Sequence, residues 1–352
     1  MLGRIIRAQE RRHASRDTNR VVRPFEWGAE FVSEFVTGRA DGGDDPRAAV
    51  LEASRAAVAR SDEFYALAPV SDYRLDGDRL TWTSAVGTPS PENNTARARF
   101  FPAEPPRRAP RKEAAPPRRR AVVVLPQWNA DAESHVALCR LLARLGIAAL
   151  RLTLPYHEER RPRELERADY MVSPNVGRTL QSLRQGVVDT RAAAAWLRAE
   201  GYERVGVTGT SIGSCTAFLA FVHDEAIDAG VFNHVSGYVA DVVWRGISTQ
   251  HVRAGVEGSL ALEELREAWL PISPMSYTAR LRHLRRRPMR FIAARHDLTF
   301  PADLSREVIS SVRATGVPVN VSWLPCGHYT SGERPWVYLD GWKIVGFLRK
   351  NL

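Results

Sequence analysis

Short apolar runs alternate with segments of helical periodicity from residue 121 to the end of the chain. An apolar run at 121–125 is followed by helical spacing over 132–145 and by another apolar run at 147–154. The alternation continues with further strands expected at 205–207, 229–232, 289–294 and 319–324. Apolar strands separated by helices form parallel sheets buried on both faces. The sequence therefore predicts an α/β fold with a mostly parallel central sheet flanked by helices, whose strands end at one edge.

Composition and periodicity divide the chain into three parts. Residues 1–70 are expected to form an N-terminal helical extension, with helix-like stretches near 27–36 and 46–59. Residues 71–120 carry two alternating stretches, expected as antiparallel edge strands, and then a linker rich in proline and arginine. Residues 121–352 form the α/β core.

Two long inserts interrupt this core at the points where strands end. One spans 156–178 and the other 235–288. The second contains helical patterns at 239–247 and 260–269. We expect it to form a helical cap over a pocket, because ligands of open α/β sheets bind at this edge.

The formal charge of +10 is concentrated in two segments. Residues 1–23 contain seven arginines against Glu10 and Asp17, and residues 103–120 contain seven basic residues against two acidic ones. The rest of the chain is balanced. A nucleic-acid-binding domain carries its basic residues on a face of the folded body. We therefore interpret both segments as solvated and expect no nucleic-acid partner.

The sequence carries no sign of a membrane or secreted protein. No apolar run approaches the roughly 20 residues that cross a bilayer, and the apolar part of the N-terminus is too short for a signal peptide, so a cytoplasmic location is expected. The cysteines have no metal-ligand spacing and are expected to be reduced and buried; they are Cys139, Cys215 and Cys326. His157 and Glu158 have no partner at metal spacing. No metal and no cofactor is expected, and the oligomeric state stays open.

The motif GTSIG at 209–213 lies between an expected strand and an expected helix. The motif alone is frequent by chance, but a strand before it and a helix after it form the sharp turn that exposes a nucleophilic serine. Its glycines leave space where side chains would collide, and a strained backbone is expected at Ser211. We predict Ser211 as the nucleophile and the Ile212 backbone N–H as an oxyanion donor. The alternative is a Gly/Ser turn without chemistry.

A nucleophilic serine needs a base and an acid that orients the base. Among nine histidines, His328 follows the last core strand, and Asp297 directly follows the strand at 289–294. The resulting order Ser, Asp, His is the order of α/β-hydrolases. Asp241 is the rival acid, and Asp297 could instead be a helix N-cap.

The second oxyanion donor is expected in the loop that follows the strand at 121–125. Pro126 has no N–H to donate. Trp128 is our first choice, while Gln127 and Asn129 stay open because spacing alone does not determine which amide points inward.

The stretch from 121 to 352 resembles the α/β-hydrolase superfamily, especially its serine-esterase and dienelactone-hydrolase-like branches. The motifs GTSIG, HDLTFP and CGHYT carry the resemblance, and segments 19–28 and 233–249 look like those of uncharacterised bacterial members. The chain differs in lacking a His-Gly pair after the strand at 121–125, where it has Pro126-Gln127. It also differs from dienelactone hydrolases, whose nucleophile is cysteine, so their substrate is not implied.

These residues predict an enzyme that cleaves a small-molecule carboxylic ester or thioester through an acyl-enzyme. An acyltransferase or a carbon–carbon hydrolase or lyase could use the same triad. A third hypothesis is a non-catalytic binding protein on a hydrolase scaffold, which the intact triad disfavours.

Overall fold

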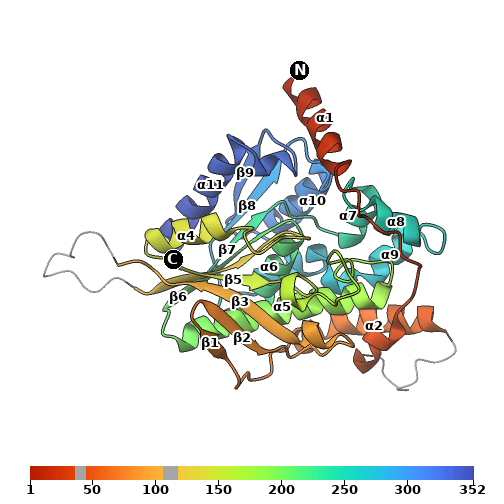
Figure 1. Ribbon diagram of the computed structural model, residues 1–352, viewed down its shortest axis with the longest axis horizontal. Coiled ribbons are helices and arrows are strands. Elements are labelled where there is room, and N and C mark those ends of the chain that lie inside the picture. The colour runs from red at the N-terminus through yellow and green to blue at the C-terminus, as the bar shows by residue number, and fades with distance from the viewer. Residues whose placement is uncertain (36–44, 106–117) are drawn as a thin grey trace, which may run out of the picture.

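A nine-stranded sheet forms the centre of the computed structural model, which describes residues 1–35, 45–105 and 118–352 (Figure 1). The strand order is β1-β2-β3-β5-β4-β6-β7-β8-β9. The strands are β1 Arg74–Asp76, β2 Arg79–Thr83, β3 Thr95–Phe101, β4 Arg120–Leu125, β5 Ala148–Thr153, β6 Arg204–Thr210, β7 Ala229–Asn233, β8 Met289–Ala294 and β9 Asn320–Leu324.

The core strands β4 to β9 pair in parallel, and β1, β2 and β3 add an antiparallel edge through the pairing of β3 with β5. The expected mostly parallel sheet and its antiparallel edge are both confirmed. Asp76 and Arg79 flank the turn between β1 and β2, in which Gly77 has a φ of +60°.

The α-helices cover both faces of the sheet. They are α1 Leu2–Ala14, α2 Pro46–Ala59, α3 Ser61–Phe64, α4 Val136–Arg144, α5 Val176–Ala199, α6 Ile212–His223, α7 Val239–Arg245, α8 Gln250–Val256, α9 Leu262–Ala268, α10 Ala302–Arg313 and α11 Trp336–Asn351. Short 3-10 turns occur at Ala29–Phe31, Ser33–Phe35, Pro91–Asn94, Glu158–Arg160, Leu270–Ile272, Pro274–Arg282 and Thr330–Gly332.

Alternation along the buried strands divides the core into two layers. In β4, Val123 and Leu125 pack into a cluster with α5, α6 and α10, whereas Val122 and Val124 pack into a second cluster with α4 and α11. Period-2 alternation places successive side chains on opposite faces. A strand that is buried on both faces therefore has apolar residues at every position, which explains the uninterrupted apolar run at 121–125.

The insert between β7 and β8 contains the expected helical segments. Its helices α7 and α9 fall within the predicted stretches, and α8 lies between them. Helix α2 of the N-terminal extension packs against this insert, where the Ser54 hydroxyl donates to the Ala268 carbonyl at 2.6 Å. Among the described residues, no helix is both long and apolar enough to cross a bilayer.

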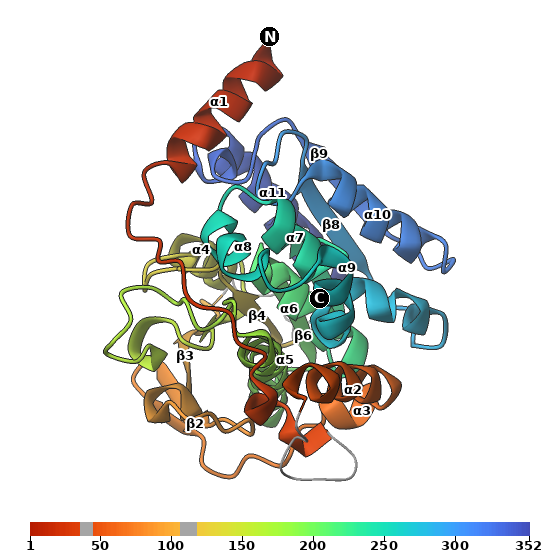
Figure 2. The same cartoon turned by 90° about the vertical axis from the view of Figure 1, so that its right-hand side faces the viewer.

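In Figure 2 the segment that follows α1 runs over the molecule, whereas the N-terminal end of α1 projects from the body. Helix α1 presents Ile6, Glu10 and Ala14 as buried residues, so the interpretation of 1–23 as a solvated arm is wrong for this face of α1. Its arginines at 4, 11 and 12 are exposed, as expected. The stretch near 27–36 forms two short 3-10 turns rather than a helix, and Val36 lies outside the described residues. Most of the proline-rich linker, at 106–117, also lies outside them.

Candidate active site

Ser211 occupies a sharp turn between β6 and α6. Its backbone has φ 60° and ψ −126°, a strained conformation for a non-glycine residue. A Cβ at Gly209 would collide with the Gly213 carbonyl, and a Cβ at Gly213 would collide with the carbonyls of Leu125 and Pro126. The prediction that these glycines leave necessary space and that Ser211 is strained is confirmed. The close approach of α6 also brings the end of β4 next to Ser211.

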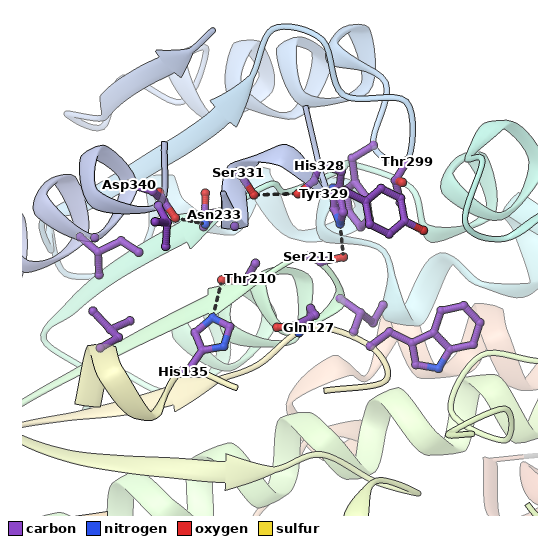
Figure 3. Close-up of a pocket in the computed structure, with 18 of the residues that line it drawn as sticks. Gln127, His135, Thr210, Ser211, Asn233, Thr299, His328, Tyr329, Ser331 and Asp340 are labelled. Carbon is purple, nitrogen blue, oxygen red and sulfur yellow. Dashed lines mark hydrogen bonds between the residues drawn. The ribbon is translucent and has the colours of Figure 1, made fainter. Parts of the chain in front are cut away.

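His328 lies beside Ser211 at the carboxyl edge of the sheet (Figure 3), and Asp297 contacts the other ring nitrogen of His328. His328 follows β9, and its Nε2 is 3.0 Å from Ser211 Oγ. Its Nδ1 is 2.9 Å from Asp297 Oδ2. The ends of β6, β8 and β9 thus bring the three predicted side chains together in one chain of hydrogen bonds.

Asp297 is held firmly in the loop after β8. Its Oδ1 accepts hydrogen bonds from the backbone N–H groups of Thr299 (2.8 Å) and Phe300 (2.6 Å), which leaves Oδ2 for His328. The local turn and the contact with His328 therefore use different oxygens of one carboxylate. The rival Asp241 lies in the cap and pairs with Arg266, at 2.7 Å and 2.5 Å, so it does not contact the imidazole.

The electrostatics of the pair favour an ionised acid beside a basic imidazole. Burial alone would raise the pKa of Asp297, but His328 and His234 lower it well below its ordinary value. Burial alone would lower the pKa of His328, but the carboxylates of Asp297 and Glu10 raise it above its ordinary value. The carboxylate therefore stabilises the imidazolium that forms when the histidine takes a proton.

Sequence reasoning missed His234, which lies directly after β7. Its side chain is fully buried and its Nδ1 is 3.2 Å from Asp297 Oδ2. Ligand atoms of His234, Asp297 and His328 all lie within 4.8 Å of one another, a spacing that a metal ion could bridge. Both ring nitrogens of His328 are, however, already directed at Asp297 and Ser211. We therefore interpret the group as an acid–base relay.

Glu10 of α1 is a second residue that sequence reasoning missed. Its fully buried carboxylate accepts hydrogen bonds from the N–H groups of His328 (2.8 Å), Tyr329 (3.1 Å) and Thr330 (2.9 Å) and from the Thr330 hydroxyl (3.0 Å). A Cβ at Gly327 would collide with this carboxylate, so glycine lets the loop approach it. The loop that carries His328 is thus fixed by a residue 318 positions earlier in the chain. Glu10 is one acidic residue among many in the sequence, and no local pattern marks it.

The loop after β4 narrows the choice of the second oxyanion donor. The Asn129 N–H donates to His157 Nε2 at 2.8 Å, so Asn129 is excluded. His157 Nδ1 faces the Pro155 carbonyl at 2.9 Å, and burial lowers the pKa of His157 to about 4, so this imidazole is neutral and accepts the Asn129 proton. Within the described parts of the chain, the backbone N–H groups of Gln127 and Trp128 donate to no other residue.

The Trp128 side chain packs as an aromatic wall. Its ring stacks on His251 of α8 with centroids 5.6 Å apart, and its Nε1 donates to the Ala168 carbonyl at 2.8 Å. These contacts hold the loop against the cap and against the 156–178 insert. They are compatible with a backbone N–H of the same residue that points towards the nucleophile.

A cavity of about 930 Å³ surrounds Ser211. The cap contributes Val239, Val242 and Val243 to its wall, and the N-terminal segment contributes Asp17. Cys215 also lines it, and all three cysteines are free and buried, which confirms the prediction of buried thiols. The cavity therefore lies between the sheet edge and the insert that was predicted to cover it.

Comparison with known proteins supports the fold through structure alone. No protein-family model and no curated protein sequence matches the chain. Among solved structures, the chain is similar to an acylaminoacyl peptidase of Pyrococcus horikoshii, with a TM-score of 0.59, 15% identity and coverage of 81% of this chain and 42% of that one.

Two further solved structures show the same similarity. A puromycin-hydrolyzing peptidase of Mycobacterium tuberculosis has a TM-score of 0.57 and 15% identity over 81% of this chain and 48% of that one. An esterase of Pyrococcus furiosus has a TM-score of 0.50 and 14% identity over 82% of this chain and 93% of that one. The chain spans less than half the length of the two peptidases and nearly the whole esterase. It has the α/β-hydrolase fold.

Proposed function

We propose that this chain is a serine hydrolase that cleaves a carboxylic ester or thioester. The observation that carries the proposal is the continuous set of contacts from Ser211 through His328 to Asp297, located in a cavity at the carboxyl edge of the sheet. An α/β-hydrolase fold with this arrangement supports acyl transfer from substrate to serine and then to water.

In the proposed mechanism, Ser211 Oγ attacks the substrate carbonyl while His328 Nε2 takes its proton. Asp297 holds the Nδ1–H tautomer of His328 and stabilises the imidazolium. The Ile212 N–H and a second amide, from Trp128 or Gln127, stabilise the tetrahedral oxyanion. His328 then gives its proton to the leaving group and activates the water that releases the acyl group.

The solved structures with this fold include peptidases as well as an esterase. We favour an ester or thioester because most of the surface of the cavity that contains Ser211 is apolar. Such walls suit hydrocarbon groups better than a polar peptide backbone, whose amides lose hydrogen bonds to water on binding. Acyl transfer to another acceptor would use the same Ser211 chemistry.

Labelling with a fluorophosphonate probe tests the nucleophile. We expect wild-type protein to be labelled and the Ser211→Ala variant to remain unlabelled, because the probe reacts with an activated serine. Ser248→Ala is the matched control, since Ser248 also lines the cavity but contacts neither His328 nor Asp297. Absence of label on the wild type, or equal label on Ser211→Ala, would contradict the proposal.

A second comparison tests the acid. We expect Asp297→Asn to reduce kcat for an ester by about 10³–10⁴-fold, because the amide favours the wrong imidazole tautomer. Asp241→Asn changes a buried carboxylate of the cap that does not contact His328, and we expect it to retain most activity. A larger loss of kcat in Asp241→Asn than in Asp297→Asn would identify Asp241 as the acid.

A further inference from the structure

One arm of the cavity beside Ser211 runs away from the cap and has no role in the proposed chemistry. It lies between α4 and α11 over the ends of β6 and β7. Figure 3 shows Ser211 and His328 at one end of this space, with Asp340 of α11 on one side and His135, next to α4, on the other. We call it the α4/α11 groove.

Two hydrogen-bonded pairs lie at the inner end of the groove, and Asn233 Oδ1 and Asp340 Oδ1 have no hydrogen-bond partner among the described residues. His135 Nε2 is 2.9 Å from Thr210 Oγ1, and Asn233 Nδ2 donates to Asp340 Oδ2 at 2.8 Å. Burial lowers the pKa of His135 to about 4, so this imidazole is uncharged at neutral pH. No cation among the described residues approaches Asp340 within ion-pair distance. This end of the groove therefore offers no charged group to bind a strongly anionic ligand.

Beyond these pairs the groove is mostly apolar, with the charged Arg349 of α11 at its far end. Helix α4 contributes Leu138 and Leu141, and α11 contributes Ile344 and Val345. Trp342, two-thirds exposed, lies at the rim. A space with largely hydrocarbon walls that begins at the proposed nucleophile suits an apolar chain, because burial of each methylene is favourable.

Two glycines of α11 keep this space open. Gly341 and Gly346 both line the cavity, and a Cβ added at either would meet no atom within 4 Å. Glycine in the interior of a helix is unfavourable relative to alanine. Neither glycine has a positive φ, and neither lies against a neighbouring backbone, so local structure does not require them. Their effect is to leave gaps among the side chains, such as Val345 and Trp342, that α11 presents to the groove.

We propose that the α4/α11 groove binds the unbranched acyl chain of the substrate, so that the enzyme prefers medium- to long-chain acyl esters or thioesters. This inference rests on the proposed function of Ser211. The groove and the nucleophile belong to one cavity, which places a chain in the groove next to the reacting carbonyl. From Gly341 to Arg349 α11 extends about 12 Å along the groove, which is long enough to accommodate an acyl chain.

Substitution of the two glycines tests the proposal with p-nitrophenyl esters of acyl chains from two to sixteen carbons. We expect wild type to show its highest kcat/KM with long chains. Gly346→Phe should lower kcat/KM for the longest esters at least tenfold and leave the shortest unchanged. Gly341→Leu, at a position nearer to Ser211, should lower kcat/KM for esters of shorter acyl chains as well. A graded cutoff is expected only if both positions border the path of the chain.

Lys350→Phe is the matched control, since Lys350 is an exposed residue of α11 that does not line the cavity. We expect its chain-length profile to equal that of wild type. Unchanged profiles in both glycine variants, or the same loss in Lys350→Phe, would overturn the proposal. Thermal unfolding should show both glycine variants folded, because a Cβ at either position meets no atom within 4 Å and helix propensity improves.

A binding measurement separates this proposal from the proposed function. Ser211→Ala protein should bind a fluorescent long-chain fatty acid, and Ser211→Ala combined with Gly341→Leu should bind it at least tenfold more weakly. Binding that the glycine substitution weakens, in a protein that hydrolyses no ester, would reject the hydrolase function and retain the groove as a chain-binding site. Ester turnover by the wild type, together with fatty-acid binding that the Gly341→Leu substitution does not weaken, would support the hydrolase function and reject the groove as the chain-binding site.

Discussion

Two loops flank Ser211, and the chain fixes them in different ways. In the loop at 127–129, the neutral imidazole of His157 accepts the backbone N–H of Asn129, and the side chains of Trp128 and Asn129 bind the backbone of Ala168. The loop at 327–330 is held by the buried carboxylate of Glu10, which accepts four hydrogen bonds. The first support comes from a residue 28 positions away and the second from one 318 positions away. The loop that carries the proposed base thus depends on the N-terminal helix.

The difference has an electrostatic consequence. A neutral imidazole fixes geometry without changing the charge near the nucleophile. A carboxylate beside the His328 backbone also helps to raise the pKa of its imidazole. We therefore expect His157 to affect kcat through geometry alone and Glu10 to affect it through both geometry and charge. The pH dependence of kcat can distinguish the two cases.

Of the substitutions that test this comparison of the two loops, Glu10→Gln is expected to have the largest effect. An amide can accept hydrogen bonds only through its oxygen, so its NH₂ group would face backbone N–H donors of the loop, and buried donors would lose their partners. Displacement of His328 by a fraction of an ångström should lower kcat about 100-fold with little change in KM. Steady-state kinetics with one ester measure both constants.

The pH profile of the same variant separates charge from geometry. His328 must be unprotonated to act as a base, so activity falls as pH decreases through its pKa. Loss of the Glu10 charge lowers that pKa, and the acidic limb of the profile should move to lower pH. Gln9→Ala, at an exposed neighbouring position of α1, should keep both rate and profile. A rate loss with an unmoved acidic limb would leave Glu10 with a purely structural role.

A smaller effect is expected from His157→Phe. The Asn129 N–H would lose its acceptor, and the oxyanion loop would be less well fixed, so kcat should fall about tenfold. The acidic limb should stay in place because His157 is neutral above about pH 4. His283→Phe, at an exposed histidine, is the control. A shift of the acidic limb in His157→Phe would remove the distinction between the two loops.

The contrast between the loops also shows what sequence could predict. The parallel sheet follows from apolar runs of buried strands, and the positions of Ser211, Asp297 and His328 follow from their places after strands. Such inferences depend on local patterns, and the side chains do lie together as expected.

Glu10 could not be predicted from the sequence because three of its four hydrogen bonds come from backbone N–H groups, which nearly every residue possesses. Its arm is rich in arginine, and that composition suggested solvent exposure. His234 was hidden for a related reason, since it contacts Asp297 through tertiary packing of β7 against β8. The second oxyanion amide depends on the direction of one N–H, which neither residue type nor spacing determines.

Asp340 of α11 is another carboxylate near Ser211 and can be compared with Glu10. Its substitution is expected to have the smallest effect. Glu10 has four donors, whereas Asp340 accepts one hydrogen bond, from Asn233. Burial raises the pKa of Asp340 to about 6 from an ordinary value of 3.8. The folded state therefore holds a proton between about pH 4 and 6 that the unfolded state has lost, and stability decreases as pH rises through this window.

Asp340→Asn should remove this loss, because the amide oxygen can still accept from Asn233 and carries no charge. We expect the free energy of unfolding of the variant to exceed that of wild type by about 1 kcal/mol at pH 7 and by less at pH 4.5. Urea titrations at both pH values measure the difference. A variant that is equally destabilised at both would mean that Asp340, like Glu10, is stabilised as a carboxylate by its surroundings, and the contrast between a satisfied and a poorly satisfied buried acid would not hold.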